Sequence, residues 1–448
     1  MLRKVRLVIR LWHRFSALRF RPVPGWLALL VWMAGGARGA VYEVGPARVY
    51  KTLQAVTGML KGGDEVKVDG GVTYPGGVTL GINTGATIRV VGVRVGGQRP
   101  VLTGGTAVVR VFGNHYVVEG FDITSGGDPR TTRGFYNVGD DVTLRDSVVH
   151  DFHCTGIAGS DASGSLTLDR VEVYHCGNGL YAHQIYVGSS LAKYPAALFQ
   201  MRYCYVHDGT GGNNVKSRVT RNIIAYNWIE GSAFHELDMV GPDPKAQKTP
   251  AGGVHCDADI IGNVLVKRAN SAGTLARFGS DGTASSRGRY RFLNNTVVVE
   301  GRSAAGFGLF WLKGEVDSLA AWNNVFYSAV GPLDMMRAEV TRVPALSGGG
   351  NWVPPGTMHV PQAWGIITGA DPGFVNAAGG DYRPAAGSPL VGAGSAPPAG
   401  LAATGIPPMR KTPVGGEAVR PAERAKDIGA YPFAAPSAVE PVAAQPGT

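Results

Sequence analysis

The chain has 448 residues and a formal net charge of +10, with 43 lysines and arginines against 33 aspartates and glutamates. Eight of the bases and no acid lie in residues 1–40, so the rest of the chain carries only +2, which argues against a nucleic-acid-binding protein. The 66 glycines lack the three-residue period of collagen, and charged residues, 17% of the chain, lack coiled-coil heptads.

The N-terminal segment predicts export. A basic stretch precedes the apolar run at 26–34 (WLALLVWMA), and small residues follow it up to Ala40. This order is that of a secretory signal peptide, and the apolar run is shorter than the ~20 residues of a membrane-spanning helix. We therefore predict a signal peptide over residues 1–39, an exported (periplasmic or extracellular) mature protein, and no membrane span after cleavage.

A short capping helix is expected at the start of the mature chain. Residues 50–61 (YKTLQAVTGMLK) carry Leu53, Val56 and Leu60 at helical spacing, and a glycine pair and the strand-like EVKVDGG follow them. Such an amphipathic helix covers the open end of the β-structure that comes after it.

The middle of the chain repeats a β-rich phrase. The phrases are VVEGFDIT (117–124), TLRDSVVHD (143–151), TLDRVEVYH (167–175), QMRYCYVHD (200–208), IIAYNWIEG (223–231), IIGNVLVKR (260–268), FLNNTVVVEG (292–301) and LAAWNNVFYS (319–328). Aligned, they place one position in register at Phe121, Ser147, Val171, Cys204, Asn227, Asn263, Asn295 and Asn324, in steps of 23 to 36 residues. Such periods indicate a solenoid. Leucine-rich repeats and propeller blades do not fit the pattern, which leaves a parallel β-helix.

The four asparagines at the shared position predict an asparagine ladder at a turn of the solenoid. Asparagine tolerates left-handed backbone and can hydrogen-bond to its stacked neighbour. We interpret these residues as part of the fold and not of the chemistry.

The C-terminal part is expected to close the other end. Residues 371–392 (DPGFVNAAGGDYRPAAGSPLVG) and 427–431 (DIGAY) flank a Pro- and Gly-rich connection. We place the cap and coils in residues 40–335, further coils and irregular loops in 336–433, and a disordered Ala/Pro-rich tail in 434–448.

The combination of TLQAV, GDEVKVDGGVTY, stacked coils, GDYRPAAGSPL and DIGAY resembles the bacterial right-handed parallel β-helix proteins of the pectate-lyase-like superfold over nearly all of residues 41–433. The resemblance implies an all-β, single-stranded right-handed parallel β-helix with a short N-terminal capping helix. The resemblance indicates the fold and not one function, because this scaffold hosts lyases, hydrolases, epimerases and adhesive proteins.

Polar residues converge on three successive coils, in HQIYVG (183–188), NNVKSR (213–218) and HELDMV (235–240). Strand alternation sends one parity outward. The outward set predicted here is Gln184, Tyr186, Asn214, Lys216, Arg218, Glu236 and Asp238, with Arg277 from the next coil and either Trp311 or Lys313 from the coil after it. Since coils stack about 4.8 Å apart, Tyr186, Lys216, Asp238 and Arg277 would form one polar row. Charged and aromatic residues in a groove suit a polysaccharide, which we expect the protein to bind as a monomer.

The segment NNVKSRVTRNIIAYNWIEGS resembles the Lys-Ser strand of the alginate- and dermatan-type lyases. The resemblance implies that Lys216 is the base that removes the proton next to a uronic carboxylate. It also implies calcium held by acidic residues just before the lysine, but those positions are Gly209 and Gly211 here. The family's calcium site is therefore not supported, and calcium bound elsewhere stays an open alternative. Arg218 or Arg277 would supply the positive charge, and like charge from Arg218 would favour a neutral lysine.

Two alternatives stay open. Glu236 and Asp238 lie about 6.6 Å apart along a strand, near the separation that glycoside hydrolases use for two carboxylates. A non-catalytic glycan-binding or adhesive solenoid would use the same groove, with Tyr186 and Trp311 as platforms, and no product would form.

Histidines and cysteines gather near one turn of the repeat. They are His150, His153, His175 and His207, with Cys154 and Cys176. Stacked turn residues are the simpler interpretation, a metal site the sharper one, and a Cys154–Cys176 disulfide is compatible with stacked coils in an oxidising compartment. Cys204 and Cys256 complete the set, with no zinc-type spacing. His183 and His235 are expected to make buried hydrogen bonds.

Overall fold

The computed structural model describes residues 39–242, 254–282, 286–301, 308–401 and 426–433. The predicted signal peptide, apart from residue 39, and the predicted tail lie outside these residues. In the described part of the chain, no helix is long and apolar enough to cross a membrane.

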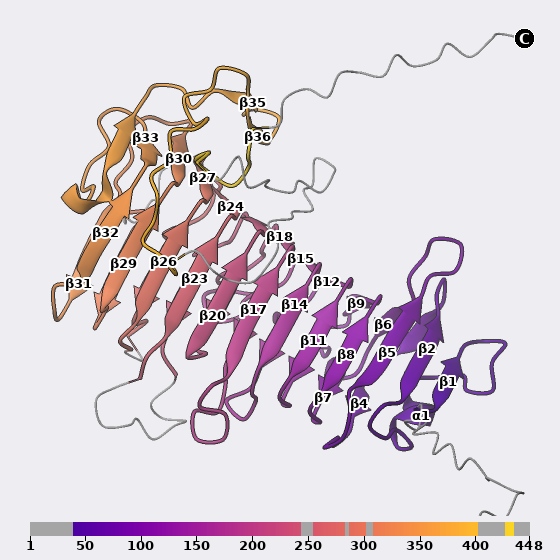
Figure 1. Ribbon diagram of the computed structural model, residues 1–448. Coiled ribbons are helices and arrows are strands. Elements are labelled where there is room, and N and C mark those ends of the chain that lie inside the picture. Colours follow the sequence, from indigo (N-terminus) through magenta and orange to yellow (C-terminus); the bar gives the residue numbers. More distant parts are fainter. Residues whose placement is uncertain (1–38, 243–253, 283–285, 302–307, 402–425, 434–448) are drawn as a thin grey trace, which may run out of the picture. The chain divides into compact units, whose positions relative to one another are not determined.

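Three long parallel sheets wind around one core, and each coil visits them in the order sheet C, sheet A, sheet B (Figure 1). Sheet A contains β1 (Val41–Val44), β2 (Glu65–Asp69), β5 (Ile88–Val93), β8 (Tyr116–Glu119), β11 (Val142–Arg145), β14 (Leu166–Asp169), β17 (Leu198–Arg202), β20 (Arg221–Ala225), β23 (Asp257–Ile261), β26 (Arg289–Leu293), β29 (Ser318–Trp322) and β32 (Ala345–Gly349). Sheet B contains β3 (Thr73–Pro75), β6 (Val101–Thr103), β9 (Asp122–Thr124), β12 (Val148–His150), β15 (Glu172–Tyr174), β18 (Tyr205–His207), β21 (Trp228–Glu230), β24 (Val264–Lys267), β27 (Thr296–Val299), β30 (Val325–Ser328), β33 (Asn351–Val353) and β34 (Ile366–Thr368). Sheet C contains β4 (Val78–Leu80), β7 (Ala107–Val111), β10 (Arg133–Asn137), β13 (Thr155–Gly159), β16 (Ile185–Val187), β19 (Val215–Ser217), β22 (Leu237–Val240), β25 (Ala276–Gly279), β28 (Phe310–Gly314) and β31 (Met336–Val340). The chain is therefore a right-handed parallel β-helix, as its sequence predicts.

Strand alternation builds the core. In sheet C, for example, Ile185, Val215, Leu237 and Ala276 pair in register and are completely buried. Towards the C-terminal end the interior is filled by stacked aromatic rings, such as Phe278 over Phe310. Parallel strands buried on the inner face use β-branched and aromatic residues that pack well on a pleated surface.

Both ends of the helix are covered. Helix α1 (Gln54–Thr57) buries Leu53 and Val56 over the first coil. It is shorter than the predicted 50–61, because the chain leaves the helical path at Gly58 and the glycine pair before Asp64.

The opposite end is closed by the 3₁₀ turn η1 (Gln362–Trp364), whose Trp364 ring stacks on Phe326. The hairpin β35 (Phe374–Asn376) and β36 (Asp381–Pro384) follows, and residues 426–433 return along sheet B, where Gly429 N donates to Asn323 O at 2.8 Å.

The predicted asparagine ladder is confirmed at the turn between sheets A and B. Asn227 N donates to Asn263 Oδ1, Asn263 N to Asn295 Oδ1, and Asn295 N to Asn324 Oδ1, each at 2.9 Å. The ladder continues to Asn351, and all five side chains are buried.

The left-handed backbone lies one residue before each ladder position, not on the ladder asparagines as the sequence analysis expected. Those preceding residues have positive φ and include Tyr226, Gly262, Asn294, Asn323 and Gly350. The left-handed residue turns the corner, and this turn aims the next side chain inwards at its neighbour.

All four cysteines are free thiols in the structure, and Cys176, Cys204 and Cys256 are buried. The Cys154–Cys176 disulfide that stacked coils would allow is therefore not formed. Cys176 instead belongs to the apolar core, and its Sγ lies 3.2 Å from Tyr174 O.

We predict that Asn263→Ala lowers the free energy of unfolding by roughly 2–3 kcal/mol, because it leaves the buried Asn227 N–H without its acceptor. Urea denaturation followed by far-ultraviolet circular dichroism measures the effect. Asn178→Ala is the matched control, since the side chain of this exposed asparagine bonds at the surface to His153. Equal midpoints for the two variants would contradict a structural role of the ladder.

Candidate functional site

One outward row of side chains crosses the middle of sheet C. Tyr186 in β16 lies opposite Lys216 in β19, Lys216 opposite Asp238 in β22, and Asp238 opposite Arg277 in β25. Trp311 in β28 follows Arg277 in the same register. The predicted order of these residues is confirmed, while their roles in binding or catalysis stay predictions.

Asp238 is the anionic centre of the row. Both of its oxygens accept from Arg277, from Nε and Nη2 at 2.8 Å each, and Oδ2 also accepts from Asn213 Nδ2 at 2.9 Å. Lys216 Nζ lies 3.2 Å from the same Oδ2. Burial alone would raise the pKa of this fully buried carboxyl, but the two cations hold it well below its usual range. Asp238 is therefore a fixed anion, not a proton donor.

A second carboxylate, from outside the sheet, completes the cluster. Asp281 Oδ2 lies 2.7 Å from Lys216 Nζ and also accepts from Arg218 Nη2. Arg218 Nε donates to the Tyr186 hydroxyl at 2.9 Å. Asp281 was not predicted from the sequence, because a residue outside the strands has no strand parity. Its only signal was its position four residues after Arg277 on the same coil.

Cations lie over the aromatic faces of the row. Lys216 Nζ is 5.9 Å from the Tyr186 ring centroid, and the Arg277 guanidinium is 5.5 Å from that of Trp311. Lys313 and Arg337 also lie over Trp311, at 4.9 and 5.6 Å. These contacts orient the rings and the cations on the outer face of sheet C.

Three residues expected on the outward face are buried in the corner between sheets B and C. Gln184 Nε2 donates to Asn214 Oδ1 at 2.8 Å, and Asn214 Nδ2 donates to Glu236 Oε2 at 2.6 Å. Glu236 Oε1 accepts from the Ser232 hydroxyl at 2.8 Å, and all four side chains are at most 1% exposed. They precede strands of only three or four residues, so the bend of the chain, not the alternation, aims them inwards.

This placement separates the two carboxylates that a hydrolase would need. Burial raises the pKa of Glu236 above its ordinary range, but its side chain is held by Ser232 and Asn214 inside the corner. Asp238 points to the outer row. The pair therefore does not face one cleft, and we do not retain Glu236 as a hydrolase residue.

His183 and His235 make buried hydrogen bonds, as expected. His183 Nδ1 accepts from Asn213 N at 3.0 Å, and His235 Nδ1 accepts from Thr274 N at 2.9 Å. Burial lowers the pKa of His183 to about 4 and that of His235 to about 3, so both rings are neutral near pH 7.

The calcium that the lyase resemblance implies does not fit the residues present. A Cβ at Gly211 would lie 2.2 Å from Asn178 N, and a Cβ at Gly209 would lie 2.9 Å from Asn214 Oδ1. An acidic side chain at either position would displace its neighbours. Nor do three His, Cys, Asp or Glu side chains meet as a metal-ligand group anywhere in the described ranges.

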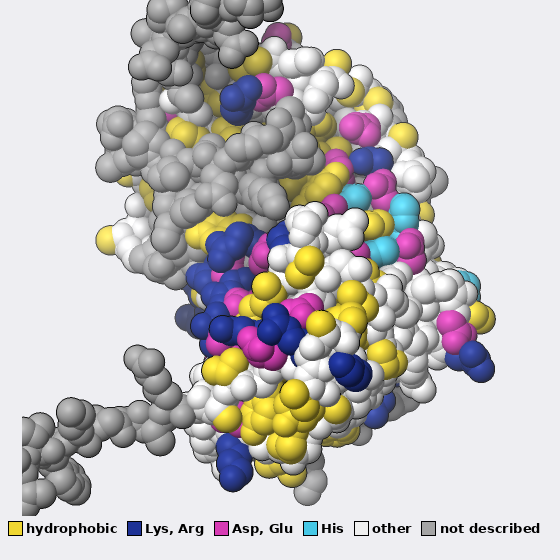
Figure 2. Space-filling view, turned by 90° about the vertical axis from the view of Figure 1, so that its right-hand side faces the viewer, with side chains coloured by type: hydrophobic (Ala, Val, Ile, Leu, Met, Phe, Trp, Pro, Cys, Tyr) yellow, Lys and Arg dark blue, Asp and Glu magenta, His cyan; other side chains and the backbone are white. Residues whose placement is uncertain are grey.

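A separate ladder of histidine and tyrosine rings lies on the outer side of sheet B, where histidines appear beside acidic side chains (Figure 2). Tyr174 stacks between His150 and His207, with centroid distances of 4.9 and 5.1 Å. His150 bonds to Asp122 and Asp151 at 2.8 and 2.7 Å. His207 bonds in the same way to Asp208 and Glu172, at 2.7 and 3.3 Å. These are stacked residues of consecutive coils, as the simpler interpretation predicts.

The carboxylates of this ladder shift the titration of its histidines. Burial lowers the pKa of His150 and of His207, but the paired carboxylates outweigh burial and raise both values above the ordinary one. For Asp151 and Asp208, burial acts to raise the pKa, and the bonds with the histidines lower it overall.

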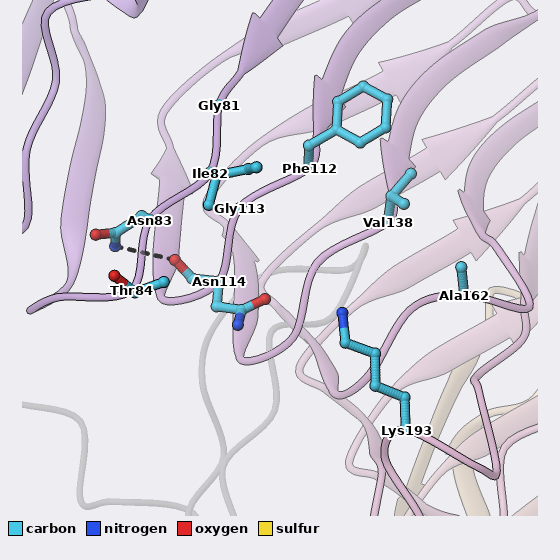
Figure 3. A pocket seen from close by; sticks show the side chains of 10 residues that line it. All are labelled: Gly81, Ile82, Asn83, Thr84, Phe112, Gly113, Asn114, Val138, Ala162 and Lys193. Carbon is cyan, nitrogen blue, oxygen red and sulfur yellow. Dashed lines mark hydrogen bonds between the residues drawn. The ribbon is translucent and has the colours of Figure 1, made fainter.

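A hollow of about 600 Å³ lies at the turns from sheet C to sheet A (Figure 3). Lys216 is not among the residues that line it. Ile82, Phe112 and Val138 give it an apolar wall, and Lys193 reaches it from the loop between β16 and β17. Asn83 Nδ2 donates to Asn114 O at 3.0 Å along its edge. The hollow does not contain the polar row.

No protein-family model matches the chain, and no curated protein sequence matches it. Among solved structures, pectate lyase Pel9A is similar over 89% of this chain and 97% of its own length, with a TM-score of 0.56 and 14% identity. The alginate lyase from Paenibacillus sp. str. FPU-7 covers 67% of this chain and 95% of its own, with 17% identity and a TM-score of 0.35. The PL6 family alginate lyase AlyGC covers 74% and 53%, with 12% identity and a TM-score of 0.39. The likeness to Pel9A shows the parallel β-helix fold.

We predict that the ladder makes stability depend on pH. A histidine pKa raised on folding stabilises fully below about pH 6.5 and loses its contribution as the pH rises through the raised value. The lowered pKa values of the aspartates act in the opposite sense, with their contribution present above about pH 4 and lost as the pH falls. As the pH rises above about 6.5, the free energy of unfolding should therefore fall less for the double variant His150→Gln/His207→Gln than for the native chain. Urea denaturation at a series of pH values measures this.

The matched control for this prediction is His359→Gln, an exposed histidine on another loop. It should keep the pH profile of the native chain. Parallel profiles for the double variant and the native chain would contradict the assignment.

Proposed function

We propose that this protein is an exported polysaccharide lyase that cleaves a uronate-containing chain by β-elimination, with Lys216 as the base. The observation that carries the proposal is the row on sheet C. There Lys216 lies between Tyr186 and Asp238, and Arg277 and Trp311 follow beyond Asp238. Arg218 lies two residues after Lys216 and bonds to Tyr186. Cations for a carboxylate and flat rings for sugars are what an acidic polysaccharide requires.

The elimination needs three functions from these residues. A base takes the proton from the carbon next to the uronate carboxylate, and positive charge stabilises the carbanion-like transition state. A proton goes to the glycosidic oxygen as its C–O bond breaks and a C=C bond forms. Lys216 is the proposed base and Arg218 and Arg277 the stabilising charges. The Tyr186 hydroxyl, which accepts from Arg218, is placed to give its own proton to the leaving oxygen.

Asp281 occupies the place that we assign to the substrate carboxylate. Its Oδ2 binds Lys216 and Arg218 together, so a uronate carboxylate would replace one anion by another at the same cations. Asp238 stays 3.2 Å from Lys216 Nζ throughout this exchange. The exchange thus places the substrate carboxylate beside the proposed base and Arg218.

We expect Lys216→Ala to lower kcat by at least about a hundredfold, because positioned acid–base groups contribute that much or more. The assay follows the absorbance of the unsaturated product with pectate and alginate as substrates. Lys67→Ala, which removes a half-buried lysine of β2 on sheet A, serves as control and should keep full activity. Unchanged turnover in Lys216→Ala would remove the lysine from its role.

The second candidate function is non-catalytic binding of a glycan. The ion pairs of the row favour it, because a lysine between two carboxylates, Asp238 and Asp281, is stabilised in its charged form, which cannot act as a base. Arg277 is likewise held by Asp238, through both Nε and Nη2. This candidate forms no unsaturated product from any uronate polymer, and Trp311→Ala weakens binding more than Lys216→Ala does.

We predict that Asp281→Asn lowers KM for the uronate polymer several-fold, because the substrate carboxylate no longer competes with an internal one. Steady-state kinetics separates this effect on KM from one on kcat. Asp128→Asn, whose carboxylate pairs only with the exposed Arg130, provides the matched loss of one charge. A raised KM in Asp281→Asn alone would show that Asp281 holds the site together instead of occupying it.

A further inference from the structure

The row that contains Lys216 does not end at Tyr186. Strand pairing continues it through Ala158 in β13 and Tyr136 in β10 to Arg110 in β7. Arg110 is thus four strand spacings from Lys216, or about 19 Å along the outer face of sheet C. This distal part of the row has no role in the function proposed above.

Two arginines meet at the distal end around one aromatic ring. The guanidinium of Arg133 lies 5.1 Å from the Tyr136 ring centroid, and that of Arg110 lies 5.7 Å from the same centroid. Arg110 also lies 5.7 Å from the centroid of Phe112, whose side chain lines the hollow of Figure 3. The two cations therefore border a ring surface and an open, mostly apolar space.

These arginines differ from the others in the described part of the chain. The other eighteen each have a carboxylate oxygen within 4.0 Å, whereas Arg110 and Arg133 have none. In addition, Arg110 Nε is buried and has no hydrogen-bond partner there. A buried donor without an acceptor is unfavourable, and more so when it belongs to a charged group, so a guanidinium that lacks an internal carboxylate is suited to an anion from outside the chain.

We propose that Arg110, Arg133 and Tyr136 form a distal binding site for a carboxylate-bearing sugar of the same polysaccharide. The carboxylate would accept hydrogen bonds from the two guanidinium groups, and the sugar ring would lie on Tyr136 or extend into the hollow beside Phe112. Ala158, whose side chain is small, lies between Tyr136 and Tyr186 in the register of this row. The site rests on the proposed function only for the identity of its ligand, a uronate chain.

The distal site makes affinity depend on chain length. A uronate oligosaccharide long enough to reach from Lys216 to Arg110 engages both the centre of the row and the distal site. A shorter one engages only the centre. Arg110→Gln and Arg133→Gln should each weaken binding of the long oligosaccharide about tenfold, the loss of one charge-assisted contact, and leave binding of the short one unchanged.

Isothermal titration calorimetry on the mature chain tests this with oligogalacturonates and oligoalginates of both lengths. The Lys216→Ala background prevents turnover during the titration. Arg130→Gln is the matched control, because this neighbouring arginine is exposed and paired with Asp128. Methyl-esterified oligogalacturonate, which has lost its carboxylates, should bind native and Arg110→Gln/Arg133→Gln chains alike.

Two results would overturn the distal site. One is equal binding of the long oligosaccharides by the native chain and the double variant, including no binding by either. The other is an equal loss for short and long oligosaccharides. Failure of the proposed lyase function is separate, since a chain that releases no unsaturated product but shows arginine-dependent, length-dependent binding would retain the distal site and lose only the elimination.

Discussion

The structure depends on one constraint, the stacking of coils at a single strand spacing without slippage. A slip of one residue would turn every outward side chain into the core, and parallel strands this short have few bonds with which to resist it. The turn between sheets A and B supplies the resistance. There a left-handed residue such as Asn294 or Gly262 directs the next side chain inwards, and that side chain bonds to the main chain of its neighbour. Register at this corner fixes register on sheet C, where the polar row lies.

With the register fixed, electrostatics decides what the row can hold. Asp238 is fully buried, and a buried carboxylate is tolerable only when cations and hydrogen-bond donors surround it. Arg277 provides them from β25, Lys216 from β19, and Asn213 from the turn just before β19. The centre of the row is thus a unit whose members depend on one another, and Asp281 is the member that comes from a turn and not from the sheet.

The sequence predicted the repeat, the β-helix, the asparagine ladder and the order of the row, because all of these follow from periodicity. The prediction of side-chain directions failed for residues that lie outside the regular alternation of a strand. Gln184, Asn214 and Glu236 precede very short strands, so the corner and not the parity sets their direction. Asp281 lies in a turn, where no pattern indicates its partners. Arg110 and Arg133 were passed over because an arginine without an acid is recognised only once all the others are seen to be paired.

The centre of the row, around Lys216, and its distal end, at Arg110 and Arg133, differ in whether their cations are paired with carboxylates. This difference gives the two places different energetic roles. Under the proposed function, a substrate carboxylate at the centre would replace Asp281, so one ion pair would be exchanged for another with little net binding energy. At Arg110 and Arg133 no carboxylate of the described chain would have to be displaced. Binding energy for the proposed substrate would therefore come mainly from sugars remote from the reacting bond, where it could offset the separation of Asp281 from Lys216. A linear polymer is the ligand that can connect the two ends, since its repeat runs along the same direction as the repeat of the coils.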